Sequence, residues 1–230
     1  MPGQLERVIG DLRRFYGPSS EPTVTKPFEQ VLWENVAYLV HDERRARAFA
    51  LLREQIGTSP EAILGAPEAK LLGVTGHGIL AETFAAKLRA AAATAMELGD
   101  LEAIARGPLP QARRALRRFP GIAEPGADRI LLFSRTHAVP ALESNGSRAL
   151  QRLGLVVAGG SYAQVHRAGT KLIAAELGPD FDQLIETYQL LRRHGQELCR
   201  RSQPLCEGCP LGDRCAHYAG LMRWSSGLKP

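Results

Sequence analysis

The 230-residue sequence contains no apolar run that approaches the roughly 20 residues needed for a membrane-spanning helix. Residues 1–17 include acidic side chains and no small-residue cleavage site, so they do not read as a signal peptide. These two absences predict a cytoplasmic protein with no membrane partner, and we expect a monomer. Hydrophobic residues make up 44% and charged residues 23% of the chain, which is ordinary for a protein with a folded core.

Strand-like alternation of apolar and polar residues is scarce, and internal repeats and low-complexity segments are absent. Over most of the chain, apolar residues recur every three or four positions, and Gly or Pro separates the segments. Asp42 is expected to cap a helix that ends near Gln55. The pattern predicts an all-α fold with a loop at 156–160. The other predicted helices are 27–40, 60–64, 81–98, 101–105, 110–118, 128–133, 148–153, 162–177 and 181–199.

Lysine is rare in a chain that is nevertheless basic. Only five of the 29 basic residues are lysines and the remaining 24 are arginines, with a net charge of +5. The planar guanidinium group binds phosphate in a bidentate manner, so an arginine-rich surface is compatible with a nucleic-acid partner. The same composition also arises when a GC-rich genome replaces Lys with Arg on solvated faces. Charge alone therefore does not identify the partner.

Cysteine is absent before residue 199, and all four cysteines follow in the spacing C-x6-C-x2-C-x5-C. A short loop brings four soft thiolate ligands together at little entropic cost, which predicts a metal site. Disulfides are disfavoured because nothing indicates export. Zinc with four cysteines remains an alternative, although zinc ribbons usually carry two CxxC pairs, and unliganded thiols would leave the clustering unexplained. The spacing favours a [4Fe-4S] cluster.

Residues 194–215, HGQELCRRSQPLCEGCPLGDRC, resemble the cluster loop of endonuclease III and the adenine glycosylases, within the helix-hairpin-helix (HhH-GPD) superfamily. The resemblance covers the cysteine spacing, the His-Gly pair, Pro204 and Pro210. It implies a structural [4Fe-4S] cluster that orients a basic loop toward DNA. Arg200 and Arg201 occupy that loop here, where a plain solvated turn is the alternative. The implied ligands are Cys199, Cys206, Cys209 and Cys215.

Residues 119–127, FPGIAEPGA, resemble the hairpin of the same superfamily. A glycine turn lets the backbone approach a phosphate, and the following helix start presents free N–H donors. The resemblance therefore implies DNA contacts at Gly121, Ala123 and Gly126, with Arg118 adding positive charge. Ala123 stands where the family has a second glycine. An ordinary pair of helices joined by a Pro-Gly turn is the alternative.

The catalytic positions depart from the family pattern. Pro125 aligns with the lysine that forms a Schiff base in bifunctional members, so we expect a monofunctional enzyme with water as the nucleophile. Arg148 and Arg152 set the register that places Glu143 at the position of the catalytic Asp, and Arg148 is expected to contact DNA. Glu143 keeps the charge with a side chain about 1.5 Å longer. A charge at a helix N-terminus is the alternative for this residue.

Glu34 aligns with the residue that protonates the departing base in adenine glycosylases. It lies in an otherwise apolar helix, and burial would raise its pKa and suit it to act as an acid, whereas a surface position is the alternative. Leu39 replaces a Gln that fills the space left by an extruded base. Tyr38 and His41 are candidates to contact the extruded base, although a core position is also compatible with Tyr38.

The resemblance implies two helical domains with a DNA-binding cleft between them. We expect one domain over 26–136, with the hairpin, and a second over 1–25 and 137–230, with the cluster. The predicted function is a monofunctional DNA glycosylase of base excision repair acting on double-stranded DNA with a damaged or mismatched base. The alternative is a non-catalytic protein that binds DNA structure or abasic sites.

Overall fold

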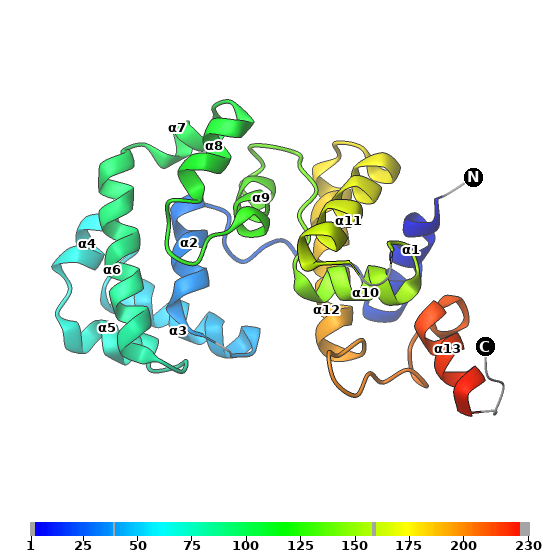
Figure 1. Cartoon of the computed structure of the whole chain (residues 1–230). Coiled ribbons are helices and arrows are strands. Elements are labelled where there is room, and N and C mark those ends of the chain that lie inside the picture. Colours follow the sequence, from blue (N-terminus) through cyan, green and yellow to red (C-terminus); the bar gives the residue numbers. More distant parts are fainter. Residues whose placement is uncertain (1–2, 39, 158–159, 226–230) are drawn as a thin grey trace. The chain divides into compact units, whose positions relative to one another are not determined.

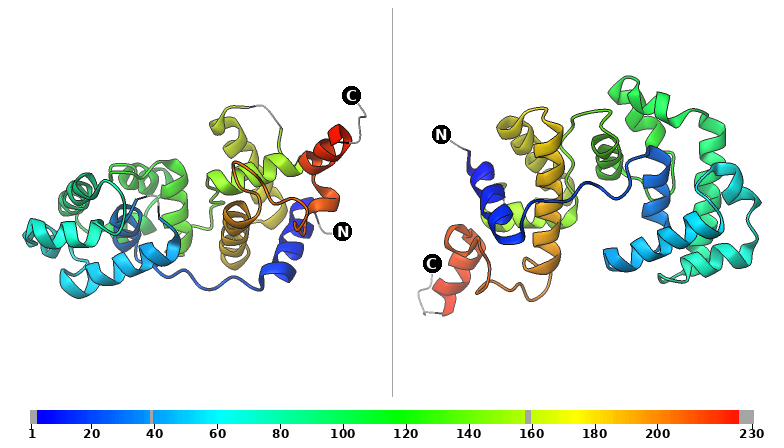
Figure 2. Two further views of the ribbon diagram at one scale, coloured as in Figure 1. Left: turned by 90° about the horizontal axis from the view of Figure 1, so that it is seen from below. Right: turned by 180° about the vertical axis from the view of Figure 1, so that it is seen from behind.

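The computed structural model describes residues 3–38, 40–157 and 160–225. Every regular element in these residues is a helix, which confirms the predicted all-α class (Figures 1 and 2). None of these helices is long and apolar enough to cross a membrane. The chain divides into two compact units, Pro22–His137 and a second made of Met1–Glu21 with Ala138–Pro230. We call them the middle unit and the terminal unit.

The middle unit is built around the long helix α6 (Ala81–Leu98), which packs against α2, α4 and α5. Alanines on its buried face allow this close packing, and Gly99 ends it with a positive φ of 76°. Leu32, Phe49 and Leu88 are among the side chains with at most 2% exposure in its core. The other helices are α2 (Pro27–Val36), α3 (Asp42–Gln55), α4 (Pro60–Gly65), α5 (Glu68–Thr75), α7 (Leu101–Arg106), α8 (Leu109–Leu116) and α9 (Glu124–Phe133).

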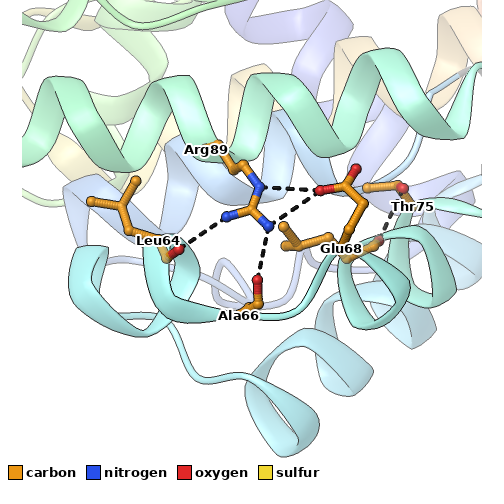
Figure 3. A network of polar contacts seen from close by, with 6 residues as sticks. Leu64, Ala66, Glu68, Thr75 and Arg89 are labelled. Atoms are coloured by element: carbon orange, nitrogen blue, oxygen red, sulfur yellow. Dashed lines mark hydrogen bonds and ion pairs between the residues drawn. The ribbon is translucent and has the colours of Figure 1, made fainter.

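Arg89 of α6 connects this helix to the segment between α4 and α5 (Figure 3). Its guanidinium donates to the carbonyl oxygens of Leu64 at 2.9 Å and Ala66 at 2.8 Å. It also contacts the Glu68 carboxylate at 3.2 Å. These bonds satisfy carbonyl groups that the end of α4 leaves without a helical partner. One side chain therefore holds three elements together.

Replacing Arg89 with Ala is expected to lower the free energy of unfolding by about 1–2 kcal/mol, because charged donors to two carbonyl groups are lost at a partly exposed site. Urea unfolding followed by circular dichroism measures the change. Arg106→Ala is the matched control, since its pair with Glu102 is 3.7 Å long and exposed, and its loss should cost less than about 0.5 kcal/mol. Equal costs for the two variants would contradict this account of Arg89.

The terminal unit consists of α1 (Gln4–Tyr16), α10 (Ser144–Leu153), α11 (Tyr162–Leu177), α12 (Phe181–Glu197), the 3-10 helix η1 (Gly212–Arg214) and α13 (Ala216–Ser225). Helix α10 packs against α11, α12 and α13, and α1 packs against α11 and α12. The backbone amides of Leu5 and Glu6 donate to the Glu176 carboxylate of α11, at 2.9 and 3.3 Å. A carboxylate at a helix N-terminus is favourable, so Glu176 caps α1 and joins it to α11.

Several helix boundaries differ from the sequence predictions. Helix α2 ends at Val36 and not at 40, because Ala37 is extended with φ −154° and the amide of Ile79 donates to the Tyr38 carbonyl at 3.3 Å. A side chain at Gly78 would lie 2.4 Å from the Tyr38 amide nitrogen, so this glycine permits the approach of the two loops. Asp42 is the first residue of α3 rather than its cap, which is His41.

Two other helices begin four residues earlier than predicted. Helix α9 begins at Glu124, and Pro125 sits in its first turn, where the missing N–H costs no helical bond. Helix α10 begins at Ser144 because Glu143 caps it. The C-terminal helix α13 was not predicted at all. Residues 156, 157 and 160 of the predicted loop lie outside helices, and 158–159 fall outside the described residues.

Candidate functional site

The hairpin of the middle unit is positioned by α2. Gly121 has φ 76°, a conformation that glycine adopts without strain. The Asn35 side chain is 1% exposed and donates to the Pro120 carbonyl at 2.9 Å and the Val31 carbonyl at 3.0 Å. Helix α9 has Ala123 as its N-cap, with no side chain occupying its first amides. Gly121 and Ala123 are exposed and Gly126 is half-buried, so the backbone N–H groups of the hairpin can donate to a phosphate oxygen.

The arginines before the hairpin are not equivalent. Arg113 forms a bidentate pair with Asp128 at 2.6 and 3.2 Å, and Asp128 is 3% exposed. Arg113 therefore joins α8 to α9. Arg118 contacts Glu97 at 2.5 Å, with both side chains largely exposed. Such an exposed pair is weak, so Arg118 can exchange Glu97 for a phosphate.

Glu34 lies in a different environment from the one the sequence predicted. Its carboxylate accepts a short hydrogen bond from Arg129, and the Arg45 guanidinium is 3.9 Å away. The expected apolar surroundings that would favour a neutral carboxyl are therefore absent. Two adjacent guanidinium groups are neighbours that favour the charged carboxylate. The role of Glu34 as an acid stays a prediction.

The loop after α2 exposes an aromatic group. Tyr38 is 39% exposed and stacks on Phe84, with ring centroids 4.8 Å apart and an interplanar angle of 15°. Lys87 lies over the same Phe84 ring at 4.1 Å. His41 is exposed at the start of α3. The structure thus places Tyr38 and His41 on the surface. Leu39, predicted to stand in the place of the Gln that fills the space left by an extruded base, lies outside the described residues.

Glu143 of the terminal unit is the N-cap of α10. One carboxylate oxygen accepts from the Gly146 amide at 2.9 Å, and the other accepts from the Asn145 side chain at 2.8 Å. The side chain is half-buried. The capping alternative considered for this residue is thus observed. Because both oxygens are held, the carboxylate has one defined orientation at the helix N-terminus.

One face of α10 connects Glu143 to the cysteine loop. Arg148 donates to the Asn145 side chain at 2.7 Å and to two backbone carbonyls, Gly195 at 2.7 Å and Cys199 at 2.9 Å. A side chain at Gly195 would lie 2.6 Å from Asn145 Cβ, so this glycine permits the approach of α12 to α10. Burial lowers the pKa of Arg148 from its usual high value. Arg148 therefore bonds within the terminal unit, and its predicted contact with DNA stays a prediction.

The four cysteines line one pocket, together with Arg152 and His194. All four are free thiols, so no disulfide joins them. Arg152 donates to Cys199 Sγ at 3.5 Å and to the carbonyls of Arg200 at 2.6 Å and Arg201 at 3.0 Å. The side chains of these two loop arginines are exposed. Arg152 thus holds the backbone of the loop while Arg200 and Arg201 face solvent.

The donor chemistry of this pocket fits an iron–sulfur cluster. Its lining contains four sulfurs, the imidazoles of His194 and His217, a guanidinium group and no carboxylate. Burial raises the pKa of the Cys206 and Cys209 thiols, and the neighbouring cysteines raise both further. A bound metal cation would act in the opposite direction, because it favours the thiolate form of its ligands. Among the described residues, no three Cys, His, Asp or Glu side chains converge closely enough to hold a single metal ion. The pocket therefore offers four thiols as ligands for a cluster.

Three contacts in the terminal unit were not predicted from the sequence. His194 is 2% exposed; its Nδ1 lies 3.3 Å from the Tyr16 hydroxyl and its Nε2 lies 3.8 Å from Cys209 Sγ. Burial lowers the pKa of His194 to about 4. Burial also raises the pKa of Tyr162, and the nearby Glu143 carboxylate raises it further. Of Tyr16, Tyr162 and His194, only His194 had a signal in the sequence, as part of the His-Gly pair of the cysteine loop.

No protein-family model matches the chain, and no curated protein matches its sequence. Solved structures do match. Endonuclease III in a non-covalent complex with DNA has a TM-score of 0.75 at 19% identity, covering 96% of this chain and 97% of that one. A thermostable thymine-DNA glycosylase has a TM-score of 0.70 at 16% identity, covering 94% and 97%. The 3-methyladenine DNA glycosylase of H. pylori, bound to 1,N6-ethenoadenine, has a TM-score of 0.61 at 16% identity, covering 83% and 93%.

Likenesses at these identities establish a shared fold. The chain shares its all-helical fold with endonuclease III and with these two DNA glycosylases, in agreement with the fold that the sequence resemblance implied.

Proposed function

We propose that this protein is a DNA N-glycosylase of base excision repair. It would hydrolyse the bond between deoxyribose and a damaged or mismatched base that has been extruded from double-stranded DNA. The observation that carries the proposal is the fixed orientation of the Glu143 carboxylate at the start of α10. A carboxylate held in this way can stabilise the positive charge that develops on the sugar, or accept a proton from the attacking water. The hairpin and the DNA glycosylases of the same fold support this reading.

Water is the proposed nucleophile. A combined lyase activity needs a primary amine that forms a Schiff base with the sugar. Pro125 stands at the hairpin position of the family's lysine, and no lysine occurs between Lys87 and Lys171. The enzyme is therefore monofunctional in this proposal.

Glu143, and not Glu34, is the carboxylate that we consider essential. Glu34 was aligned with a proton donor, but the guanidinium groups of Arg129 and Arg45 favour its charged form. Its ion pairs instead join α2 to α9 and α3 within the middle unit. Among the described residues, the hydrogen-bond donors to the Glu143 carboxylate are the Gly146 amide, the Asn145 side chain and the Ser144 hydroxyl.

We further propose that Cys199, Cys206, Cys209 and Cys215 hold a [4Fe-4S] cluster. When bound, the cluster would crosslink the loop and take no part in base hydrolysis. The chain's own contribution is the loop backbone, which Arg152 holds so that Arg200 and Arg201 stay exposed toward a DNA backbone.

Replacing Arg200 and Arg201 together with Ala is expected to reduce the slope of log K against log salt by about two, because each arginine that neutralises a phosphate contributes roughly 0.9. Fluorescence anisotropy with a labelled duplex at several salt concentrations measures the slope. Arg13→Ala with Arg14→Ala removes the same charge from α1 and should leave the slope unchanged. Equal slopes for the two double variants would exclude the loop as a phosphate contact.

The proposed function is tested with a panel of end-labelled duplexes, each carrying one damaged or mismatched base. We expect at least one to yield an abasic site that alkali cleaves, with no strand cleavage before alkali. Borohydride should trap no covalent adduct, and a trapped adduct would contradict the monofunctional mechanism. The alternative, a protein that binds DNA structure or abasic sites without catalysis, is favoured by Ala123 in place of the second hairpin glycine. Tight binding to the panel without any excision would establish that alternative.

A further inference from the structure

The cysteine pocket receives a side chain from the interior of the terminal unit. His194 of α12 points Nε2 at Cys209 Sγ, 3.8 Å away, and is 2% exposed. Its backbone carbonyl accepts from the Cys199 amide at 2.8 Å. A single residue therefore contacts two of the four cysteines, one through its backbone and one through its ring.

The other ring nitrogen is occupied by the first helix. The Tyr16 hydroxyl, at the end of α1, lies 3.3 Å from His194 Nδ1. Arg193, the residue before His194 in α12, also contacts this tyrosine. Its guanidinium lies 4.6 Å over the Tyr16 ring and donates to the Tyr16 carbonyl at 3.2 Å. Tyr16, near the start of the chain, therefore contacts the same histidine that contacts the cysteine loop near the end of the chain.

The chemistry of the three groups selects one arrangement of protons. A metal-bound cysteine sulfur is a thiolate, which only accepts hydrogen bonds, so the ring atom that faces it must carry a proton in order to bond to it. If Nδ1 carried the proton, the lone pair of Nε2 would face the thiolate. With the proton on Nε2, Nδ1 is an acceptor, and the Tyr16 hydroxyl at 3.3 Å is the donor that faces it. The favoured order is Tyr16 O–H to Nδ1, then Nε2–H to Cys209 Sγ.

We propose that Tyr16 and His194 form a hydrogen-bond relay that directs one N–H at the Cys209 sulfur and thereby raises the reduction potential of the [4Fe-4S] cluster. The inference rests on the cofactor part of the proposed function and goes beyond base excision. Hydrogen bonds to ligand sulfurs stabilise the extra electron density of the reduced cluster. Tyr16 and His194 are positioning residues in this relay, since neither is a ligand.

The test compares the wild-type protein as isolated with three variants, using the midpoint potential from protein-film voltammetry together with iron and sulfide content. His194→Leu removes the N–H. At a fixed applied potential, the ratio of oxidised to reduced cluster is expected to rise about tenfold, which corresponds to a midpoint potential ~59 mV more negative for a one-electron couple. Tyr16→Phe removes only the hydroxyl and should shift the potential in the same direction by less. His194→Gln retains an N–H donor near the position of Nε2 and should restore most of the wild-type value. Tyr38→Phe in the middle unit is the matched control and should leave the potential unchanged.

Tyr16→Phe keeps the inference testable if His194→Leu fails to fold. A full cluster at the wild-type potential in Tyr16→Phe, and in His194→Leu where it folds, would overturn the relay. A protein that contains zinc or no metal would overturn both the relay and the cofactor proposal. Base excision measured on the same preparations reports separately on the glycosylase proposal.

Discussion

Replacing Glu143 with Gln is expected to lower the single-turnover rate of base excision by about two to three orders of magnitude, a typical effect of removing one stabilising group from a transition state. Gln has nearly the same shape and keeps an oxygen that can accept from the Gly146 amide. It lacks the negative charge that would stabilise the cationic sugar or activate water. Excision is measured with enzyme in excess on the best duplex of the panel, and binding is measured by anisotropy. Binding should change little, because the loss is confined to the transition state.

Two further variants separate Glu143 from Glu34. Glu143→Asp keeps the charge on a side chain that also caps helices well, and should retain more activity than Gln. Glu34→Gln breaks the contacts with Arg129 and Arg45, so it should lower the unfolding temperature while changing the excision rate by less than about tenfold. A slow Glu34→Gln enzyme beside an active Glu143→Gln enzyme would reverse our assignment of the essential carboxylate.

The sequence predicted accurately those helices whose ends are set by residues next to them in the chain. Helix α6 runs from Ala81 to Leu98 as predicted, because alanine-rich sequence favours it throughout and Gly99 ends it. Helix α2 was predicted to run to 40 from apolar periodicity alone. It ends at Val36 because the loop after it contacts the Ile79 segment, about 40 residues away in the chain. A contact at that distance leaves no periodic signal in a single sequence.

The candidate site shows the same division. The four cysteines could be grouped from spacing, since all lie on one short loop, and they do line one pocket. The environment of Glu34 could not be predicted, because its partner Arg129 is 95 positions away on α9. Tyr16 gave no signal either, since an aromatic residue near the end of an amphipathic helix is ordinarily a packing residue. Long-range pairs of this kind require the fold before they can be recognised.

Replacing Arg148 with Met is expected to lower the free energy of unfolding by about 2–4 kcal/mol, since a charged donor to two backbone carbonyls is lost at a half-buried site. This corresponds to a fall in the unfolding temperature of about 5–15 °C for a protein of this size. The rate of base excision should fall as well, because Asn145 would lose the bond that holds it against Glu143. Urea unfolding and the excision assay measure the two effects on the same preparation.

The geometry of the guanidinium group explains why Arg148→Lys should not rescue the loss. Arg148 reaches Asn145, Gly195 and Cys199 through a planar fork, whereas an ammonium group offers one compact centre. Arg13→Met is the control, because its pair with Glu186 is at the surface and should contribute less than about 1 kcal/mol. If Arg148→Met were as stable as Arg13→Met and excised bases at the wild-type rate, then α10 would not connect the cysteine loop to Glu143. If stability fell while excision stayed normal, Arg148 would support the loop without orienting the carboxylate.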